Sequence, residues 1–255
     1  MDRAMGLAAL RKRLASGGTS VGSWMQFRDS SVAEVMGQAG YDWVALDLEH
    51  GHYSRAQLPG LFRALELGGT LALARLAVGS DEECQSVLDA GAAGVIVPMV
   101  DSASRLERVR SACRWPDAGT RGVAFSRANM FGTNFNPYQE EAKAPFLVAM
   151  VEHVDALGEL DSILAVDGLD ALLIGPYDLS ASLGRTGLLD HQDVVDAEAE
   201  IRQAALVHGV ACGVHVVEPG RRGVLERIAA GDRFVAHSMD AVFLSRSANW
   251  REATL

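Results

Sequence analysis

The sequence predicts an α/β fold of the (β/α)8 TIM-barrel type, formed by a single domain over residues 1–255. Eight apolar runs of strand length alternate with helix-like segments along the chain. The runs are continuously apolar, which is typical of strands buried on both faces of a parallel sheet. The length of 255 residues is also typical of one such barrel. An open doubly wound sheet should instead have a glycine-rich turn after its first strand, whereas Gln26-Phe27-Arg28-Asp29 follows it here.

The expected elements alternate along the whole chain. The expected strands are, in order, 20–26, 42–48, 70–75, 94–99, 146–152, 170–174, 210–216 and 233–237. The expected helices are 30–39, 54–68, 80–90, 101–113, 154–166, 191–208, 219–230 and 239–250. Capping side chains favour several of these helix starts, for example Ser54 and Ser80, and glycines follow four of the helices.

One long irregular stretch, 115–145, separates the fourth expected helix from the fifth expected strand. Loops of this length inside compact domains are usually functional or mobile. We therefore expect it at the end of the barrel that carries the chemistry.

Composition excludes several classes of protein. The chain has 23 basic and 33 acidic residues, a net charge of −10, and no basic run of the kind that binds nucleic acid or an anionic membrane. It shows no signal peptide and no apolar stretch long enough to span a membrane. Cys84, Cys113 and Cys212 are scattered and odd in number, which favours buried reduced thiols and a cytoplasmic location.

Catalytic side chains of TIM barrels lie at the carboxyl ends of the strands. Polar residues gather at those positions here, namely Asp47, Glu49, His50, Arg75, Glu152 and Asp178. Glu152 and Asp178 follow neighbouring strands and could converge on Mg²⁺, Mn²⁺, Co²⁺ or Zn²⁺. Alternatively, each carboxylate could cap a helix or pair with an arginine.

Arg75 and His50 are candidate catalytic residues. Arg75 ends the apolar run TLALAR, where a guanidinium requires an anionic partner. That partner could be a substrate, or it could be Asp47 or Glu49. His50 could form an acid–base dyad with Asp47, three residues earlier, or could be a hydrogen-bonded structural histidine.

Lysine usage argues against Schiff-base chemistry. The chain has only Lys12 and Lys143, and both lie at the end of the barrel opposite to the expected site. A Schiff base needs a lysine amine inside the pocket. An enzyme of this kind acting on oxo compounds should therefore polarise the carbonyl with a metal ion.

Several motifs occur in an order that resembles a known family. They are Asp47-Leu-Glu-His50, the strand ending ALAR75, VPMV at 97–100, Glu152, and IGPYDLSASLG at 174–184. Together they resemble the HpcH/HpaI family of class II, metal-dependent pyruvate aldolases, which includes 4-hydroxy-2-oxoheptanedioate and 2-dehydro-3-deoxyglucarate aldolases. The resemblance covers the chain from Gly22 to about residue 245.

The resemblance implies roles for individual residues. Glu152 and Asp178 match the metal ligands, His50 and Asp47 the acid–base dyad, and Arg75 the arginine that binds developing negative charge. Gly175 and Pro176 match the backbone that surrounds the pyruvate carboxylate, and Tyr177 is next to them. Arg121 matches an arginine whose role in the family is less clear. Glu49 should support the site. Met150 and Tyr177 depart from residues common in the family, so the pocket wall should differ.

The resemblance also implies a reaction and an assembly. The reaction is reversible cleavage of a 4-hydroxy-2-oxo acid to pyruvate and an aldehyde through a metal-stabilised pyruvate enolate. The assembly is a homo-oligomer, a hexamer or smaller, with exchange of a C-terminal helix between subunits. Two alternatives are a lyase for CoA thioesters like the citrate lyase β subunit, and a barrel that binds metal and oxo acid without catalysis. The acidic composition disfavours the former.

Overall fold

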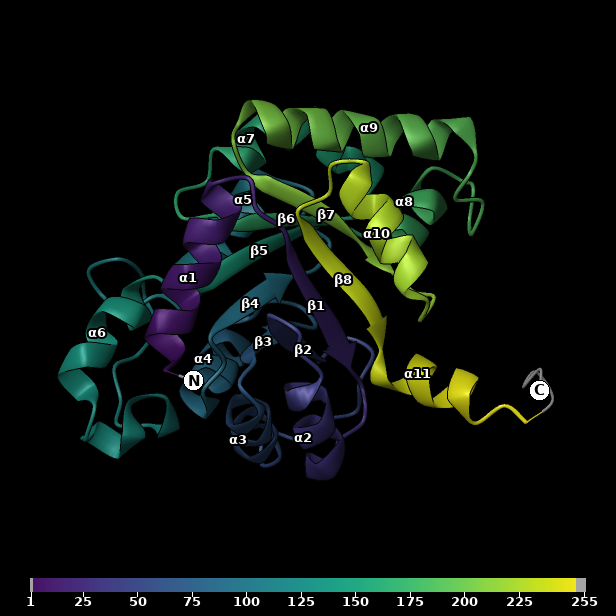
Figure 1. Ribbon diagram of the computed structural model, residues 1–255. Coiled ribbons are helices and arrows are strands. Elements are labelled where there is room, and N and C mark those ends of the chain that lie inside the picture. The colour runs from purple at the N-terminus through teal and green to yellow at the C-terminus, as the bar shows by residue number, and fades with distance from the viewer. Residues whose placement is uncertain (1, 251–255) are drawn as a thin grey trace.

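The computed structural model describes residues 2–250 and forms a closed barrel of parallel strands in the order β1 to β8 (Figure 1). The strands are β1 (Ser20–Met25), β2 (Trp43–Asp47), β3 (Leu71–Arg75), β4 (Gly94–Val97), β5 (Phe146–Val151), β6 (Ala171–Ile174), β7 (Ala211–Val216) and β8 (Phe234–Met239). This architecture confirms the predicted fold class.

Helices surround the barrel (Figure 1). They are α1 (Arg3–Ala15), α2 (Ser30–Gln38), α3 (Leu58–Gly68), α4 (Asp81–Ala90), α5 (Ala103–Cys113), η1 (Arg127–Gly132), α6 (Phe135–Lys143), η2 (Val154–Glu159), α7 (Leu160–Leu164), α8 (Pro176–Ser182), α9 (Gln192–Val207), α10 (Arg221–Ala229) and α11 (Asp240–Ser247). The sequence did not predict α1 or α8. The last helix, α11, extends away from the barrel.

Side chains of the strands alternate between two cores. Those directed into the barrel, such as Trp24, Trp43 and Phe234, pack into one buried cluster. Those directed outward, such as Val44 and Leu46, pack against the helices in a second, larger cluster. Burial on both faces explains why the strands read as continuous apolar runs in the sequence. All three cysteines are buried and free, and every helix within residues 2–250 is too short or too polar to cross a bilayer.

The stretch 115–145 differs from its prediction in structure and in location. It contains η1 and α6, whose small core includes Trp115 and Tyr138. Arg127 donates a hydrogen bond to the carbonyl of Ala90, at the carboxyl end of α4, and therefore lies near the start of β4. The stretch consequently covers the amino-terminal end of the barrel beside α1 (Figure 1), so its expected place at the catalytic end is wrong. The reason is that it follows α5, and a segment from a helix to the next strand lies at the strand's amino end.

Helices α2 and α3 approach each other through Gly37 and Gly68. A Cβ atom on Gly68 would lie 2.4 Å from the carbonyl carbon of Gly37. We expect Gly68→Ala to lower the free energy of unfolding by about 1–3 kcal/mol, because the helices must separate. Gly60→Ala in the same helix is the matched control, since a Cβ there meets nothing within 4 Å. Urea unfolding of both variants tests this, and equal stabilities would contradict it.

Candidate active site

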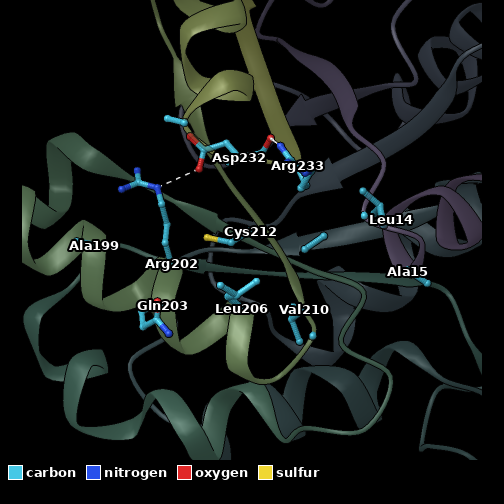
Figure 2. A pocket seen from close by; sticks show the side chains of 15 residues that line it. Leu14, Ala15, Ala199, Arg202, Gln203, Leu206, Val210, Cys212, Asp232 and Arg233 are labelled. Atoms are coloured by element: carbon cyan, nitrogen blue, oxygen red, sulfur yellow. Dashed lines mark hydrogen bonds and ion pairs between the residues drawn. The ribbon is translucent and has the colours of Figure 1, made fainter.

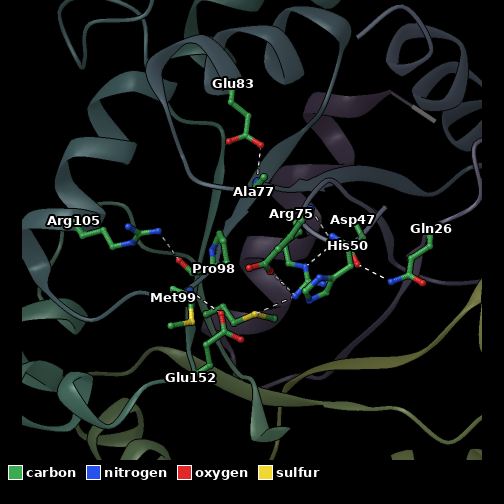
Figure 3. A network of polar contacts seen from close by, with 12 residues as sticks. Gln26, Asp47, His50, Arg75, Ala77, Glu83, Pro98, Met99, Arg105 and Glu152 are labelled. Carbon is green, nitrogen blue, oxygen red and sulfur yellow. Dashed lines mark hydrogen bonds and ion pairs between the residues drawn. The ribbon is translucent and has the colours of Figure 1, made fainter. Parts of the chain in front are cut away.

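The carboxyl ends of two pairs of neighbouring strands, β2 with β3 and β5 with β6, carry the predicted residues to the barrel mouth, where Asp47, His50, Arg75 and Glu152 are shown in Figure 3. Asp47 ends β2 and Arg75 ends β3, and the register of the sheet places these two residues directly beside each other. Glu152 follows β5, and Asp178 lies in the first turn of α8, just after β6. The site is therefore built on rigid strand ends.

Arg75 and Asp47 form a buried, two-pronged ion pair. The Arg75 Nε and Nη2 atoms donate to Asp47 Oδ1 and Oδ2 at 2.9 and 2.7 Å. Asp47 is 1% exposed. Burial alone would raise the pKa of Asp47, but hydrogen bonding to Arg75 and the charge of Arg75 outweigh it, and the pKa is lowered. Asp47 is consequently ionised at neutral pH and fixes the guanidinium in one orientation.

The predicted side-chain dyad between Asp47 and His50 is not formed. Asp47 Oδ1 accepts hydrogen bonds from the backbone N–H groups of Glu49 and His50, each at 3.2 Å, and Oδ2 accepts one from the Gln26 amide at 3.0 Å. Together with Arg75, these donors occupy the carboxylate. Asp47 therefore holds the turn that carries His50, while the imidazole of His50 is exposed at the barrel mouth.

The remaining nitrogen of Arg75 points across the mouth of the barrel. Nη1 lies 3.0 Å from Glu49 Oε2 and 3.9 Å from the sulfur of Met150 on β5. The guanidinium carbon also lies 5.0 Å from the ring centroid of Trp24, a cation–π contact. Arg75 is thus held from three sides, with Nη1 directed toward the strand that carries Glu152.

Glu152 is a buried carboxylate that forms no ion pair with any cation of residues 2–250. It is 2% exposed, and its Oε1 accepts a hydrogen bond of 2.7 Å from the backbone N–H of Met99. The pKa of Glu152 is raised to about 7, chiefly by burial; the charges of Asp178 and Glu49 contribute to this rise, while the hydrogen bond from Met99 and the charge of Arg75 oppose it. A Cβ on residue 175 would lie 2.3 Å from Glu152 Oε2, so Gly175 leaves the space that this carboxylate occupies.

Negative charge exceeds positive charge at the mouth. Burial raises the pKa of Glu49, and although Arg75 and His50 lower it, Asp47 and Asp178 raise it further. Four carboxylates thus lie at the mouth: Asp47 and Glu49 pair with the guanidinium of Arg75, whereas Glu152 and the exposed Asp178 do not. The donor set consists of hard oxygens and its excess charge is negative, so the residues present fit a divalent cation such as Mg²⁺ or Mn²⁺. Within residues 2–250 no group of three or more ligating side chains is preassembled, so Glu152 and Asp178 would hold the ion together with water or substrate.

The loop after β6 lies at the same mouth. Gly175 is the N-cap of α8 and Pro176 is its first residue, so the backbone turns there immediately beside Glu152. Tyr177 is 52% exposed and stands on the rim. These positions agree with a pocket wall formed by 175–177.

Arg121 is not brought to this site. Its Nη2 donates to the hydroxyl of Tyr138 at 3.0 Å, and its guanidinium lies 5.7 Å from the ring centroid of Trp115. Both partners belong to the stretch at the amino-terminal end of the barrel. Within one chain, Arg121 therefore supports that stretch and does not contact Arg75 or Glu152.

Three residues that support the site were not predicted from the sequence. Gln26 follows β1 and binds Asp47 through its amide. Met99 adopts φ 51°, which aims its N–H at Glu152 and has no signature in the sequence. Glu83 accepts hydrogen bonds from the backbone N–H groups of residues 77 and 79, at 2.6 and 2.9 Å, and so fixes the loop after Arg75. Only Gln26, a polar residue at a strand end, could have been found by position.

A hollow of about 680 Å³ lies at the opposite, amino-terminal end, between α1, α9 and α10 (Figure 2). Its charged residues already have partners: Arg202 binds the carboxylate of Asp232 at 3.0 Å, and Arg233 donates to the backbone carbonyls of Ile228 and Asp232 at 3.1 and 3.0 Å. None of the predicted site residues lines it. The mouth that holds Arg75 and Glu152 is therefore the better candidate.

Comparisons with known proteins agree with this geometry. The profile of the family described as HpcH/HpaI aldolase/citrate lyase matches residues 20–246. A hydroxypyruvate/pyruvate aldolase from Roseobacter denitrificans is 35% identical over 255 residues, covering 96% of this chain and 98% of the relative. A 2-keto-3-deoxy-L-rhamnonate aldolase from Klebsiella pneumoniae is 34% identical, covering 95% and 91%. The crystal structure of a protein of this family from Burkholderia cenocepacia has a TM-score of 0.89 at 29% identity, covering 95% and 97%.

Proposed function

Because this chain belongs to the HpcH/HpaI aldolase/citrate lyase family, we propose that it is a divalent-metal-dependent aldolase that reversibly cleaves a 4-hydroxy-2-oxo acid to an aldehyde and pyruvate or hydroxypyruvate. The observation that carries the proposal is the arrangement of Arg75 and the buried carboxylate of Glu152 at the barrel mouth (Figure 3), with Asp178 near enough for its charge to raise the pKa of Glu152. The aldolase names of the relatives confirm the predicted enzyme class, and support a reaction of this type.

Glu152 and Asp178 would hold the cation, which is Mg²⁺, Mn²⁺ or Co²⁺, with Zn²⁺ as a further choice. When bound, such an ion supplies Lewis-acid polarisation of the 2-oxo group. Glu152 must be ionised to serve as a ligand, and its raised pKa means that cation binding and proton release are coupled. Glu49, adjacent to both Arg75 and His50, supports the site by balancing their charge.

Arg75 would bind the negative charge that develops on the oxygen of the enolate. Asp47 and Trp24 already fix its guanidinium, so little reorganisation is required during the reaction. The backbone at Gly175 and Pro176 would receive the carboxylate of the oxo acid, and Tyr177 would border it.

His50 would act as the general base on the C4 hydroxyl during cleavage, and as the general acid during addition. Its imidazole is exposed at the mouth and does not contact the carboxylate of Asp47. Asp47 instead accepts hydrogen bonds from the backbone N–H groups of Glu49 and His50, and so holds the turn that orients the imidazole. Asp47 is in this proposal a positioning residue for both Arg75 and His50.

The proposal also includes a cellular location and an oligomeric state. We place the enzyme in the cytoplasm as a homo-oligomer, hexameric or smaller, acting on small-molecule oxo acids and aldehydes rather than on nucleic acids or membranes. The net charge of −10 supports that choice of substrates. The projecting helix α11 is the segment that neighbouring subunits would exchange.

Hydrogen exchange into the donor substrate tests the proposal without knowledge of the aldehyde. In D₂O with Mg²⁺ or Mn²⁺, we expect the enzyme to incorporate deuterium into the methyl group of pyruvate, because formation of the enolate requires only the donor half of the site. Mass spectrometry measures the incorporation. Dialysis against EDTA should abolish it, and borohydride with pyruvate should not trap the protein, since no lysine lies at the mouth.

Two outcomes would favour the alternative functions. Tight binding of CoA, measured by titration calorimetry, would favour a thioester lyase like the citrate lyase β subunit. Binding of metal and pyruvate without deuterium incorporation would favour a barrel that binds both without catalysis. Exchange that survives complete removal of metal would contradict the proposal itself.

A further inference from the structure

A cavity of about 570 Å³ adjoins the candidate active site on the side of β1 and β2. It is lined by Gln26, Phe27, Arg28, His50, Gly51, His52 and Ala241. Gln26 connects it directly to the site, because the amide of Gln26 also donates to Asp47. Its volume lies within the range of about 300–1,000 Å³ that is usual for small-molecule pockets.

The charged and titratable residues of this cavity are all basic. Arg28, His50 and His52 line it and no carboxylate does. Among residues 2–250, Arg28 forms no ion pair with an acidic side chain. The neighbouring Asp29 does not pair with Arg28. Its carboxylate accepts a hydrogen bond of 2.7 Å from the N–H of Ser31 and caps α2.

The loop that carries Arg28 is held in place. The buried carboxylate of Asp240 accepts hydrogen bonds from the backbone N–H groups of Gln26 and Phe27, at 2.8 and 2.9 Å. Tyr53 donates a hydrogen bond of 2.5 Å to the carbonyl of Met25, at the end of β1. Arg28 therefore follows a fixed backbone, although its side chain forms no hydrogen bond or ion pair with residues 2–250.

We propose that this cavity is the subsite for the aldehyde and that it selects aldehydes with an anionic group, a carboxylate or a phosphate, which Arg28 binds. The inference rests on the proposed aldolase function, in which the donor occupies the space between Arg75 and Glu152. The aldehyde carbonyl must then approach past His50, whose imidazole lines this cavity. Arg28 and His52 line the same cavity and would contact the rest of the aldehyde.

Electrostatics favours the same orientation. The other side of the mouth carries the carboxylates of Glu49, Glu152 and Asp178, which repel an anion. The chain as a whole carries a net charge of −10. Because Arg75 is paired with Asp47 and Glu49 and is assigned to the donor, the charge of an anionic aldehyde is attracted to the side of the mouth where Arg28 lies, and a guanidinium there increases both its affinity and its rate of arrival.

The test compares aldehydes with and without an anionic group. With pyruvate as donor, kcat/KM is measured for 4-oxobutanoate against butanal, and for glyceraldehyde 3-phosphate against glyceraldehyde. We expect at least one anionic member to be preferred, and Arg28→Ala to lower its kcat/KM about 10- to 100-fold, the usual effect of losing a charged hydrogen bond. The neutral aldehydes should change less than about 2-fold. The carboxylate and phosphate pairs distinguish the two sources of charge.

Arg55→Ala is the matched control. Arg55 lies after β2 on the same side of the barrel, and is exposed, but it pairs with Glu82 and does not line the cavity. Its loss should leave the preference unchanged. Equal use of charged and neutral aldehydes by the native enzyme, or an Arg28→Ala effect of the same size on both, would overturn the inference. Deuterium exchange into pyruvate remains the separate check, because its absence would refute the proposed aldolase function and not the cavity alone.

Discussion

Replacement of Arg75 by alanine should lower the rate of deuterium exchange into pyruvate by about 10²–10³-fold, the effect typical of losing one fixed donor to a developing oxyanion. Within the described part of the chain, residues 2–250, Arg75 is the one cation that pairs with Asp47 and Glu49, and Asp47 and Trp24 fix its orientation. Arg75→Lys should recover little of this rate, because an ammonium cannot reproduce the two-pronged contact with Asp47.

The same substitution should destabilise the fold. Without Arg75, the carboxylate of Asp47 stays buried with only amide partners, a loss that typically costs about 3–5 kcal/mol. Because burial would then raise the pKa of Asp47 unopposed by Arg75, part of the lost stability should return as the pH falls and Asp47 is protonated. Thermal unfolding at several pH values measures this.

A second variant separates the catalytic loss from the structural one. The double variant Arg75→Met with Asp47→Asn removes both charges, and should recover stability without recovering exchange. At the other end of the barrel, Arg202→Met breaks a contact with the buried Asp232, and should lower the melting temperature while leaving the exchange rate intact. Normal exchange by Arg75→Ala would show that the guanidinium does not bind the enolate.

The sequence predicted the barrel because its strands are buried on both faces. β2, for instance, lies at Trp43–Asp47 within the expected 42–48, and both Val44, directed outward, and Trp43, directed inward, are buried. The helix α1 was missed because it carries three basic residues in its second half and only a narrow apolar face, formed by Leu7, Leu10 and Leu14. A strand buried on both faces is therefore easier to recognise in a sequence than a helix that buries only one narrow face.

The residues of the site could be predicted from the sequence, but the contacts between them could not. The ends of the apolar runs can be identified in the sequence, so the positions of Asp47, Arg75 and Glu152 at strand ends could be predicted. The partner of Asp47 could not, because the choice between His50 and Arg75 depends on the register of β2 against β3. In the same way, the positive φ of Met99, which turns a backbone N–H onto Glu152, comes from tertiary structure.

Replacement of Glu152 by glutamine should abolish metal-dependent exchange and, unusually, stabilise the metal-free protein. The pKa of Glu152 is raised from 4.5 to about 7, first by burial. Since the folded-state pKa lies above the unfolded one, the folded protein is stabilised at low pH and loses that contribution as the pH rises from about 4.5 to about 7. The difference corresponds to on the order of 3 kcal/mol at pH 8. Glutamine avoids this cost, and its amide oxygen still accepts the hydrogen bond from Met99.

The melting temperatures of metal-free native protein and Glu152→Gln should therefore diverge between pH 5 and pH 7, with the variant several degrees higher at pH 8. Calorimetric titration with Mn²⁺ should show binding by the native protein that weakens below pH 7 and is lost in the variant. Asp167→Asn is the control: hydrogen bonds from Arg110 and Arg114 lower the pKa of Asp167, so its neutralisation should lower stability at neutral pH and leave metal binding unchanged. A carboxylate that costs stability in the absence of a cation, at the end of a barrel strand and beside Asp178, is best explained as a ligand. Undiminished metal affinity in Glu152→Gln would remove that explanation.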